Sequence, residues 1–557
     1  MRITGHRASI ARRTSIGAVA FGAVAVLVLS GCTSRDGDTS PTSAPTIGAS
    51  DLVASLPAAT TAVDDVTWGL VEGEPRSLVP GADYNFVEPN LCDSLLRVEP
   101  DFSISSGIAE KADWVDPVTF VIDLRPGVTF WDGSPVTPDD VVYSLERHHT
   151  DVASAFYGAF VLVSAIEVTG DSQVTVRFTA PDSTFRDALS GGAGAVLSKT
   201  FSEAQGQALG TSSGDLMCAG PYKLESWTPG SEIVTVANED YWDGAPLVKK
   251  LTFKFIPDGT TLTNALLEGE VDGAFNVPPA SRDVFESSDE GRLVVGPSTA
   301  SFSFGPTRDT GAGANPAIRQ ALSMAIDRDQ YIATVLHGLG QPQSTFVAPF
   351  SWSGSSAADV YQAGYDALAA PSVDLDAAKK LVADSGEDTS VPLRIAIPAG
   401  SKELSQTAAI IQSAAEQIGL TVEIDERQAA DFAAIFLPDP GPRENIDFVA
   451  TTGYTETPGV LAYPQLFLLP PATGGIFNWT GYSNPEVTAG LQAARTTPDA
   501  AGAASAYVGA QEIFAPDQLQ VTLAGSFHTT FLNNSLTGAV TSVAAYASPW
   551  ALHLGGE

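Results

Sequence analysis

The chain is poor in basic side chains, in histidine and in cysteine. Its 557 residues contain 29 lysines and arginines against 65 acids, which gives a formal charge of −36. A surface this negative repels phosphate backbones, which argues against nucleic acid as a partner; a saline habitat would favour the same composition. The six histidines and three cysteines form no H-E-x-x-H motif and no cysteine pair at zinc-ligand spacing. We therefore expect no metal and no cofactor.

Long apolar runs are scarce as well. Residues 16–29 form a run that would extend about 21 Å as a helix, short of a hydrocarbon core about 30 Å thick. No other run is long enough to span a membrane. Four arginines and no acid precede this run, a pattern that predicts a signal peptide over residues 1–31. The Arg12-Arg13 pair leaves general secretory and twin-arginine export both open.

The end of that segment, Leu29-Ser30-Gly31-Cys32, resembles the lipobox of bacterial lipoproteins. Small residues there admit a signal peptidase, and the Cys32 thiol accepts diacylglycerol. Residues 32–63 are rich in Ser, Thr, Pro, Ala and Gly, which is typical of a flexible tether. The resemblance implies a protein anchored by lipid to the extracellular face of the cell membrane. An ordinary secretory signal is the alternative.

Cys92 and Cys218 are the remaining cysteines once Cys32 is assigned to the lipid. Two cysteines in an oxidising compartment favour a disulfide. The alternative is a pair of separately buried thiols that behave as small hydrophobes.

The two halves of the chain differ in style. Strands are expected in the first half at residues 64–70, 120–124, 128–131, 166–169, 174–178, 233–236 and 251–256, with a helix at 90–98. In the second half, Asn315-Pro316 opens a helix that Gly338 can end, and another helix is expected at 375–383. Residues 391–425 then follow a strand–helix–strand pattern, which implies a parallel sheet. A Gly/Pro/Thr-rich loop at 305–313 suggests the boundary between the halves.

Enzyme motifs are weak in this sequence. Gly210-Thr211-Ser212-Ser213-Gly214 matches G-x-S-x-G, but a nucleophile elbow needs a strand before the serine and a helix after it. The flanks here resemble a helix and a turn. Asp139 and Asp140 are adjacent, so they cannot flank one glycosidic bond as a hydrolase requires. A secreted hydrolase built on Ser212 or an acid pair remains the alternative outside binding proteins.

Residues 123–149 combine five acids, a tryptophan and two adjacent histidines. We interpret Thr137 and Pro138 as the cap and first residue of a helix whose next two acids face its positive end. Asp132-Gly133 predicts a turn, and His148-His149 a solvated helix end. The stretch is thus explained as scaffold.

Several motifs, in order, resemble family 5 extracellular solute-binding proteins, the oligopeptide, dipeptide and nickel receptors of ABC importers. The resemblance covers about residues 64–550. Its motifs are "FVIDLRPGVTFWDGSPVTPDDVVYSLER", "GPYK", "WTPGSEIVTVANEDYWDGAP", "ALLEGEVDGAF", "NPAIRQALSMAIDRDQYI" and "FNWTGYSNPEV".

The resemblance implies an α/β fold of the two-lobe periplasmic-binding-protein type II, with mixed sheets flanked by helices and an extra subdomain in lobe one. The expected division is lobe one at 64–305 with the subdomain at about 100–210, lobe two at 306–515, and a return to lobe one at 516–557. Such a protein catalyses nothing. It is expected to act as a monomer that captures a small peptide between its lobes and delivers it to ABC permease subunits with their ATPases. An oligosaccharide or another small organic solute is the alternative ligand.

Candidate ligand residues follow from the same resemblance. In peptide-binding members an acid of lobe two pairs with the α-amino group within an Asp-Pro loop. Here Thr457-Pro458 stands at that place, and Glu456 is the acid nearby. Aromatic side chains at the expected crossing between lobes and in the lobe-two loops complete the candidate set, which is Phe302, Phe304, Tyr454, Glu456 and Trp479.

Overall fold

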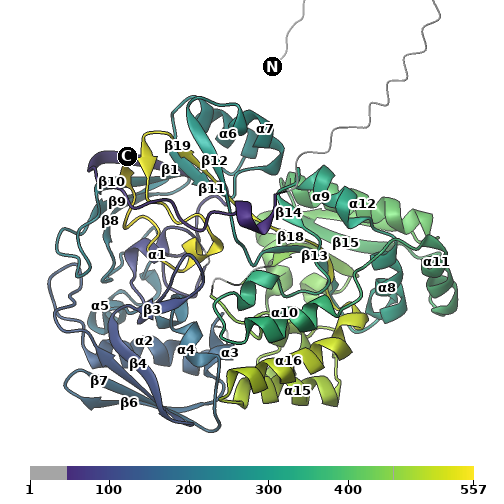
Figure 1. Ribbon diagram of the computed structural model, residues 1–557, viewed down its shortest axis with the longest axis horizontal. Coiled ribbons are helices and arrows are strands. Elements are labelled where there is room, and N and C mark those ends of the chain that lie inside the picture. Colours follow the sequence, from purple (N-terminus) through teal and green to yellow (C-terminus); the bar gives the residue numbers. More distant parts are fainter. Residues whose placement is uncertain (1–46, 84, 153, 454, 456) are drawn as a thin grey trace, which may run out of the picture. The chain divides into compact units, whose positions relative to one another are not determined.

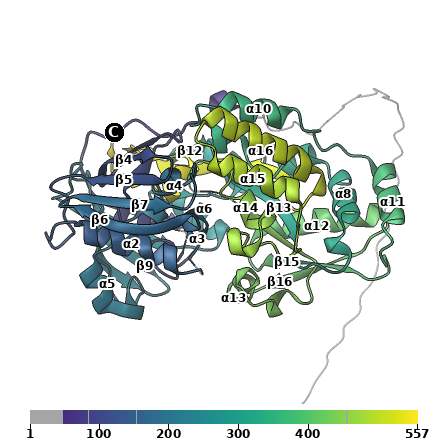
Figure 2. The ribbon, with the colours of Figure 1, turned by 90° about the horizontal axis from the view of Figure 1, so that it is seen from below.

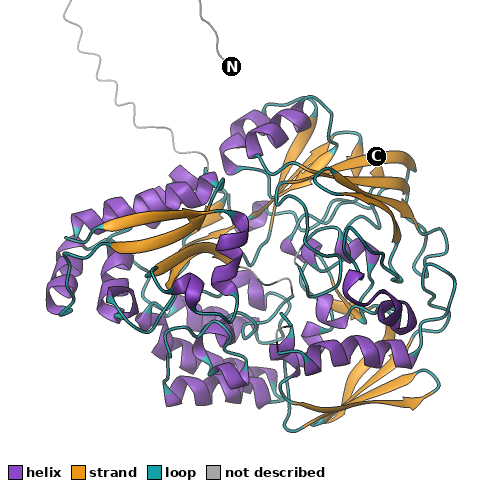
Figure 3. Cartoon of the chain, turned by 180° about the vertical axis from the view of Figure 1, so that it is seen from behind, coloured by secondary structure: helices purple, strands orange, loops and turns teal. Residues whose placement is uncertain are grey.

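Two mixed β-sheets organise the protein, whose computed structural model describes residues 47–557 apart from 84, 153, 454 and 456 (Figure 1). The predicted signal peptide and Cys32 lie outside these residues. Within the described part, no helix is both long enough and apolar enough to cross a membrane. Smaller sheets and helical layers surround the two large sheets, as Figure 3 shows by secondary structure.

The first sheet contains seven strands in the order β12-β19-β11-β1-β10-β9-β8. Strand β1 runs parallel to β10 and β11, and the other pairs are antiparallel. Trp68, Phe275 and Trp550 pack at its centre, with ring centroids 4.4–4.8 Å apart. The strands are β1 Val63–Leu70, β8 Tyr222–Thr228, β9 Glu232–Ala237, β10 Val248–Phe255, β11 Gly273–Phe275, β12 Gly291–Gly296 and β19 His528–Asn533, and the helices beside them are α6 Gly259–Leu267 and α7 Arg282–Glu286.

The second sheet contains six strands in the order β14-β18-β13-β17-β15-β16. The predicted strand–helix–strand unit is confirmed, because β15 and β16 pair in parallel with α12 between them. Ser401 caps α12, and Gly419 ends the turn after it with a φ of +86°. The elements are β13 Ser301–Pro306, β14 Gly340–Gln341, β15 Leu393–Pro398, β16 Val422–Arg427, β17 Phe448–Gly453, β18 Val521–Ser526, α8 Pro316–Met324, α9 Arg328–Val335, α11 Leu375–Asp384, α12 Lys402–Gln417 and α13 Ala429–Ala433.

A smaller subdomain lies between β1 and β8 in the chain. Its four-stranded sheet has the order β4-β5-β7-β6, and β6 and β7, which contain the strands predicted at 166–169 and 174–178, form an antiparallel hairpin. Its helix α2 begins as predicted: Thr137 accepts the Asp140 N–H, and the Asp140 carboxylate accepts the Thr137 N–H at 3.0 Å. The elements are β4 Ala109–Asp116, β5 Thr119–Leu124, β6 Val163–Gly170, β7 Gln173–Phe178, α2 Pro138–Thr150, α3 Tyr157–Phe160, α4 Phe185–Ala188 and α5 Lys199–Gln205.

A helical layer is inserted in the second-sheet part of the chain. Its long helices α15 and α16 lie side by side, with α10 against α16 (Figure 2). Their shared core includes Tyr507 and Phe514. The layer consists of α10 Ala358–Asp366, α14 Pro464–Leu468, α15 Pro485–Thr496 and α16 Ala500–Phe514.

The chain passes between the large sheets twice, and both predicted boundaries need correction. The first passage is at residues 297–300, between β12 and β13, and the second is at Phe527, between β18 and β19. The predicted boundaries at residues 305 and 515 therefore lie inside the second-sheet part. Both passages are short segments outside any helix or strand, and no change of composition marks them. The Gly-rich loop after β13 stays within the second-sheet part.

Three local predictions also need correction. Residues 90–98 form a short helix, α1 Glu88–Leu91, and then strand β2 Leu96–Val98, which pairs with β3 Ile104–Ser106. Residues 128–131 make only an isolated bridge, between Thr129 and Pro135. The helix expected from Asn315 to Gly338 is divided into α8 and α9, because Asp327 caps a new helix.

The last strands of the chain are β20 Leu536–Thr537 and β21 Gly555–Gly556, which pair with each other.

Candidate functional site

A cavity of about 310 Å³ lies at the carboxyl end of β17, between the second sheet and the subdomain. Thr451, Thr452 and Gly453 of β17 line it, which is where open α/β sheets place ligands. Every described lining residue is uncharged. The others are Ala155, Phe156, Gly158, Ala159 and Ala188 from the subdomain and Phe436, Val449, Thr455, Thr457, Ala462, Tyr463, Gln465, Leu466, Phe467, Ile476, Phe477, Trp479 and Gln520 from the second-sheet part.

Aromatic rings form one wall of this cavity. Trp479 lies 5.4 Å from Phe477 and 5.8 Å from Phe436 between ring centroids. The Arg443 guanidinium stacks 4.8 Å from the Trp479 ring and donates to the backbone oxygens of Ile435 and Leu437 at 2.6 and 2.7 Å. Arg443, which does not line the cavity, therefore fixes the position of the Trp479 ring, and the backbone carbonyl groups accept hydrogen bonds from its charged guanidinium.

Polar side chains of the second-sheet part complete that side. The Gln520 side-chain oxygen accepts the Ser303 hydroxyl at 3.1 Å, and Gln465 is buried at the cavity edge. Burial raises the pKa of the Tyr463 phenol, so that it stays a neutral hydrogen-bonding group. The arrangement offers hydrogen bonds in apolar surroundings, which suits an uncharged polar ligand surface.

The opposite wall comes from the subdomain, and His148 holds it in place. Its Nδ1 and the Ser154 hydroxyl share a hydrogen bond of 2.8 Å, and the same hydroxyl accepts the Phe156 N–H at 3.2 Å. The His148 ring also meets the Phe156 ring edge-on, with centroids 5.2 Å apart.

The prediction of a solvated histidine pair is wrong for His148, which is only 3% exposed. Burial, helped by the nearby Arg147 charge, lowers the pKa of His148 to about 3, so the ring is neutral. Phe156 and Phe160 pack over it after a turn of the chain that the helix pattern alone did not reveal.

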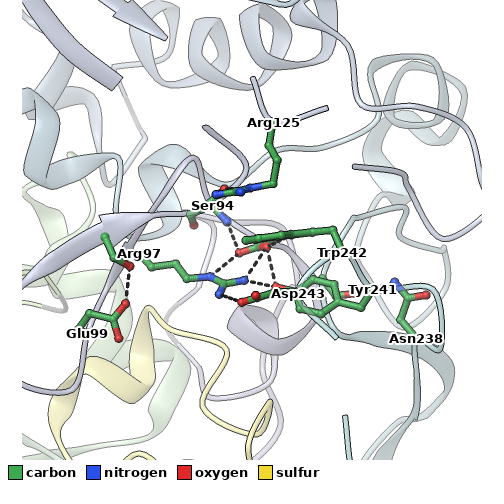
Figure 4. A network of polar contacts seen from close by, with 12 residues as sticks. Ser94, Arg97, Glu99, Arg125, Asn238, Tyr241, Trp242 and Asp243 are labelled. Carbon is green, nitrogen blue, oxygen red and sulfur yellow. Dashed lines mark hydrogen bonds and ion pairs between the residues drawn. The ribbon is translucent and has the colours of Figure 1, made fainter. Parts of the chain in front are cut away.

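A second polar cluster lies away from the cavity, and its side chains make their hydrogen bonds to one another (Figure 4). The buried Asp93 carboxylate accepts hydrogen bonds from Tyr241 at 2.7 Å, Trp242 at 2.8 Å and Arg97 at 3.1 Å. Arg97 and Arg125 lie on opposite sides of the Trp242 ring, at 4.8 and 4.3 Å. Burial lowers the pKa of Arg97, but its interactions with Asp93, Tyr241 and Asp243 together outweigh burial and raise the pKa. This cluster stabilises the fold by joining two of the sequence motifs.

Three of the predicted ligand residues are described by the structure, and they do not come together. Trp479 lines the cavity. Phe302 is 8% exposed and faces Tyr331 at 6.3 Å, and Phe304 is fully buried against Phe448 at 5.3 Å. Both phenylalanines belong to the core of the second sheet and do not line the cavity.

Two further predicted residues, Tyr454 and Glu456, lie outside the described residues. Their neighbours Gly453, Thr455 and Thr457 all line the cavity.

The predicted disulfide is present: Cys92 and Cys218 are joined, with Cα atoms 4.9 Å apart.

Most residues that line the cavity were not predicted from the sequence. Phe477 stands two residues before Trp479 in the same motif, so the aromatic pair could have been proposed together. The subdomain wall around Phe156 and Gly158 carries no local signal, because it becomes a wall only when residues about 300 positions later pack against it.

The enzyme candidates gain no support from their surroundings. Ser212 lies in an exposed turn, and no strand precedes it. Over the described part of the chain, no three His, Cys, Asp or Glu side chains gather where they could hold a metal ion.

Two sheets joined by two passages, with an aromatic cavity between the second sheet and the subdomain, define a two-lobe binding protein. The family model "Bacterial extracellular solute-binding proteins, family 5 Middle" matches residues 103–474, and the chain belongs to this family. The resemblance seen in the sequence motifs is thereby confirmed.

Individual relatives agree with this assignment. The glutathione-binding protein GsiB of Pectobacterium atrosepticum is 25% identical over 460 residues, which cover 81% of this chain and 86% of that protein. Protein XP55 of Streptomyces lividans is 27% identical over 509 residues, covering 87% and 88%.

The fold is shared with solved structures. The oligopeptide-binding protein AppA of Bacillus subtilis, solved with a nonapeptide, has a TM-score of 0.76 at 20% identity and covers 89% of this chain and 99% of its own. The binding protein DppA of Helicobacter pylori, solved with a peptide, has a TM-score of 0.77 at 18% identity, with the same coverage.

Proposed function

We propose that this protein is a receptor that binds a small peptide in the cavity at the end of β17 and delivers it to an ABC importer. The observation that carries the proposal is the cavity itself, which has walls from the second-sheet part and from the subdomain. Its volume of about 310 Å³ lies at the lower end of the range for small-molecule sites, about 300–1,000 Å³. The relatives named for glutathione and oligopeptide binding support this class of ligand.

The open edge of β17 favours a peptide. Its pairing with β15 involves only Phe448 and Val449, whereas its pairing with β13 continues to Gly453. In an antiparallel pair, alternate backbone groups point away from the partner strand. The last residues of β17 can therefore offer N–H and C=O groups to an extended ligand backbone, as in strand addition.

The uncharged lining limits which peptide fits. A charged side chain enclosed there would lose its hydration without meeting an opposite charge among the described lining residues, which is costly. We expect apolar or aromatic side chains to occupy the aromatic wall. A sugar could also stack on Trp479, so an oligosaccharide is the second candidate ligand.

Glu456 is the proposed partner of the peptide's α-amino group, because its neighbours Thr455 and Thr457 line the cavity. A buried ammonium needs such a carboxylate. Glu456→Gln should weaken binding of free-amine peptides and leave N-acetylated ones unaffected. Equal loss for both kinds of peptide would remove this role.

Delivery and anchoring complete the proposal. The mature protein is proposed to be held on the extracellular face of the membrane by lipid on Cys32, to act as a monomer and to catalyse nothing. Cys32→Ser should release it from the membrane fraction into the medium.

A thermal-shift panel tests whether the protein binds short peptides without converting them. Dipeptides, tripeptides, oligosaccharides and a nickel–histidine complex would be compared, with mass spectrometry of each mixture afterwards. Stabilisation by short peptides that are recovered intact is the expected result. A response to sugars alone, or cleavage of any compound, would contradict the peptide-receptor proposal.

A further inference from the structure

A buried ion pair joins the subdomain to the helical layer. Arg495, in the last turn of α15, donates from Nε and Nη2 to one oxygen of Asp182 at 3.1 and 2.6 Å. The two side chains are 7% and 0% exposed, and they lie 313 residues apart in the sequence. Asp182 follows β7, so the pair connects elements that belong to different parts of the fold.

The same contact reaches the cavity wall. Nη2 of Arg495 also donates to the Gly158 backbone oxygen at 3.0 Å, and Gly158 lines the cavity. Next to it, the Ser183 N–H donates to the Arg495 backbone oxygen at 2.7 Å, and the Ser183 hydroxyl donates to the Ala494 oxygen at 3.1 Å. Neither Arg495 nor Asp182 lines the cavity itself.

A buried ion pair of this kind has two stable arrangements, one in which the charges are paired and dry and one in which they are separated and hydrated. Together, the two charges satisfy each other in a dry site; apart, each needs water, because an uncompensated buried charge is strongly unfavourable. If the subdomain moves away from α15, both groups become hydrated at once. Contacts of this kind switch between discrete states and do not deform gradually.

We propose that Asp182, Arg495 and the Gly158 carbonyl form a closure latch that holds the subdomain wall against the helical layer and thereby sets how long a ligand stays bound. The latch rests on the proposed binding function, because Gly158 is a wall of the same cavity. Arg495 is a positioning residue in this scheme and makes no contact with the ligand.

Hydrogen exchange on the ligand-free protein tests the latch without any ligand. In Arg495→Gln, the amides of Ser183 and of residues 157–160 should exchange at least about tenfold faster than in the parent protein. Arg394→Gln is the matched control, because Arg394 pairs with Glu423 at 3.3 Å with both side chains about half exposed. Unchanged exchange in Arg495→Gln would overturn the latch.

Dissociation kinetics supply the second measurement, with the tripeptide Ala-Phe-Leu as probe. Losing one partner of a buried pair acts mainly on dissociation, so Arg495→Gln and Asp182→Asn should each release the probe about 10–100-fold faster, with a similar association rate. The double variant should be no faster than the single variants. Equal dissociation from parent and variants would overturn the latch, whereas failure of the parent to bind any peptide of the panel would count against the proposed function and leave the exchange result to decide the latch.

A milder variant guards against misfolding. Arg495→Lys keeps the charge but loses the planar fork that reaches Asp182 and Gly158 together. It should give an intermediate exchange rate, and a rate equal to that of the parent protein would overturn the role of the fork.

Discussion

The hydroxyl of Thr299 donates to the backbone oxygen of Thr455 at 2.6 Å and accepts the N–H of the same residue at 3.1 Å. Thr299 lies in the first passage between the sheets, and Thr455 lines the cavity. One side chain thus ties the passage between the two large sheets to the cavity wall.

Thr299→Val should weaken peptide binding while leaving the fold intact. Valine keeps the shape of threonine but loses both hydrogen bonds, each of which contributes about 0.5–1.5 kcal/mol. We expect an affinity loss of about tenfold by titration calorimetry. Thr299→Ser is the control, since it keeps the hydroxyl and should bind nearly as well as the parent protein. Equal affinity of the valine variant and the parent would show that this tie is unimportant.

Asp93→Asn should be strongly destabilising. The carboxylate accepts hydrogen bonds from Tyr241, Trp242 and Arg97, and its loss leaves Arg97 buried without its main partner. Breaking a buried pair costs about 3–5 kcal/mol. Glu167→Gln breaks the Arg177–Glu167 pair, whose side chains are about half exposed, and should cost about 0–1 kcal/mol. Guanidinium unfolding would measure both, and similar losses for the two variants would contradict the assigned role of Asp93.

The sequence predicted local structure well where neighbouring residues alone determine that structure. The start of α2 follows from Thr137, Pro138 and Asp140, which are adjacent residues with known preferences for helix ends. The strand–helix–strand unit around α12 follows from periodicity and from Gly419 after the helix. The family itself was visible because several such framework motifs occur in order.

The cavity could not be predicted in the same way. Phe302 and Phe304 were chosen for their position near the passage, but strand β13 is buried on both faces, so they belong to the core. His148 gives the converse case, since a polar residue at a helix end became buried when Phe156 and Phe160 folded over it. Burial is a property of tertiary packing, and a local pattern does not contain it.

Removing the disulfide should lower stability without abolishing the fold. Cys92 and Cys218 close a loop with a sequence separation of 126, and losing a disulfide that closes a long loop costs about 2–5 kcal/mol. Cys92→Ser with Cys218→Ser should therefore lower the unfolding midpoint in guanidinium. Because both sulfur-bearing residues are at most 2% exposed, the native protein should resist reduction and react with thiol reagents only when unfolded. Rapid alkylation of native protein after mild reduction would contradict this.

Asp187 on α4 should make a contribution to stability that falls as the pH rises towards neutrality. Burial raises the pKa of Asp187 from 3.8 to about 7, reinforced by Asp182 and opposed by Arg186. Between these two values the folded protein keeps a proton that the unfolded chain has released, so its stabilising effect is complete below about pH 4 and is lost as the pH rises through about 7.

Asp187→Asn replaces the carboxylic acid by a neutral group of the same shape and should remove this dependence. The melting temperature of the parent protein relative to that of the variant should fall between pH 5 and pH 8, and the variant should be the more stable of the two at pH 8. His148 and His528 contribute the opposite slope over much of the same range, because burial lowers the pKa of each from 6.5 to about 3 and their stabilising effect is lost as the pH falls through that range. Because the two pH ranges overlap, the difference between the curves of the parent protein and of Asp187→Asn isolates Asp187, since the histidines contribute equally to both. Parallel melting curves for the parent protein and Asp187→Asn above pH 5 would contradict the role of Asp187.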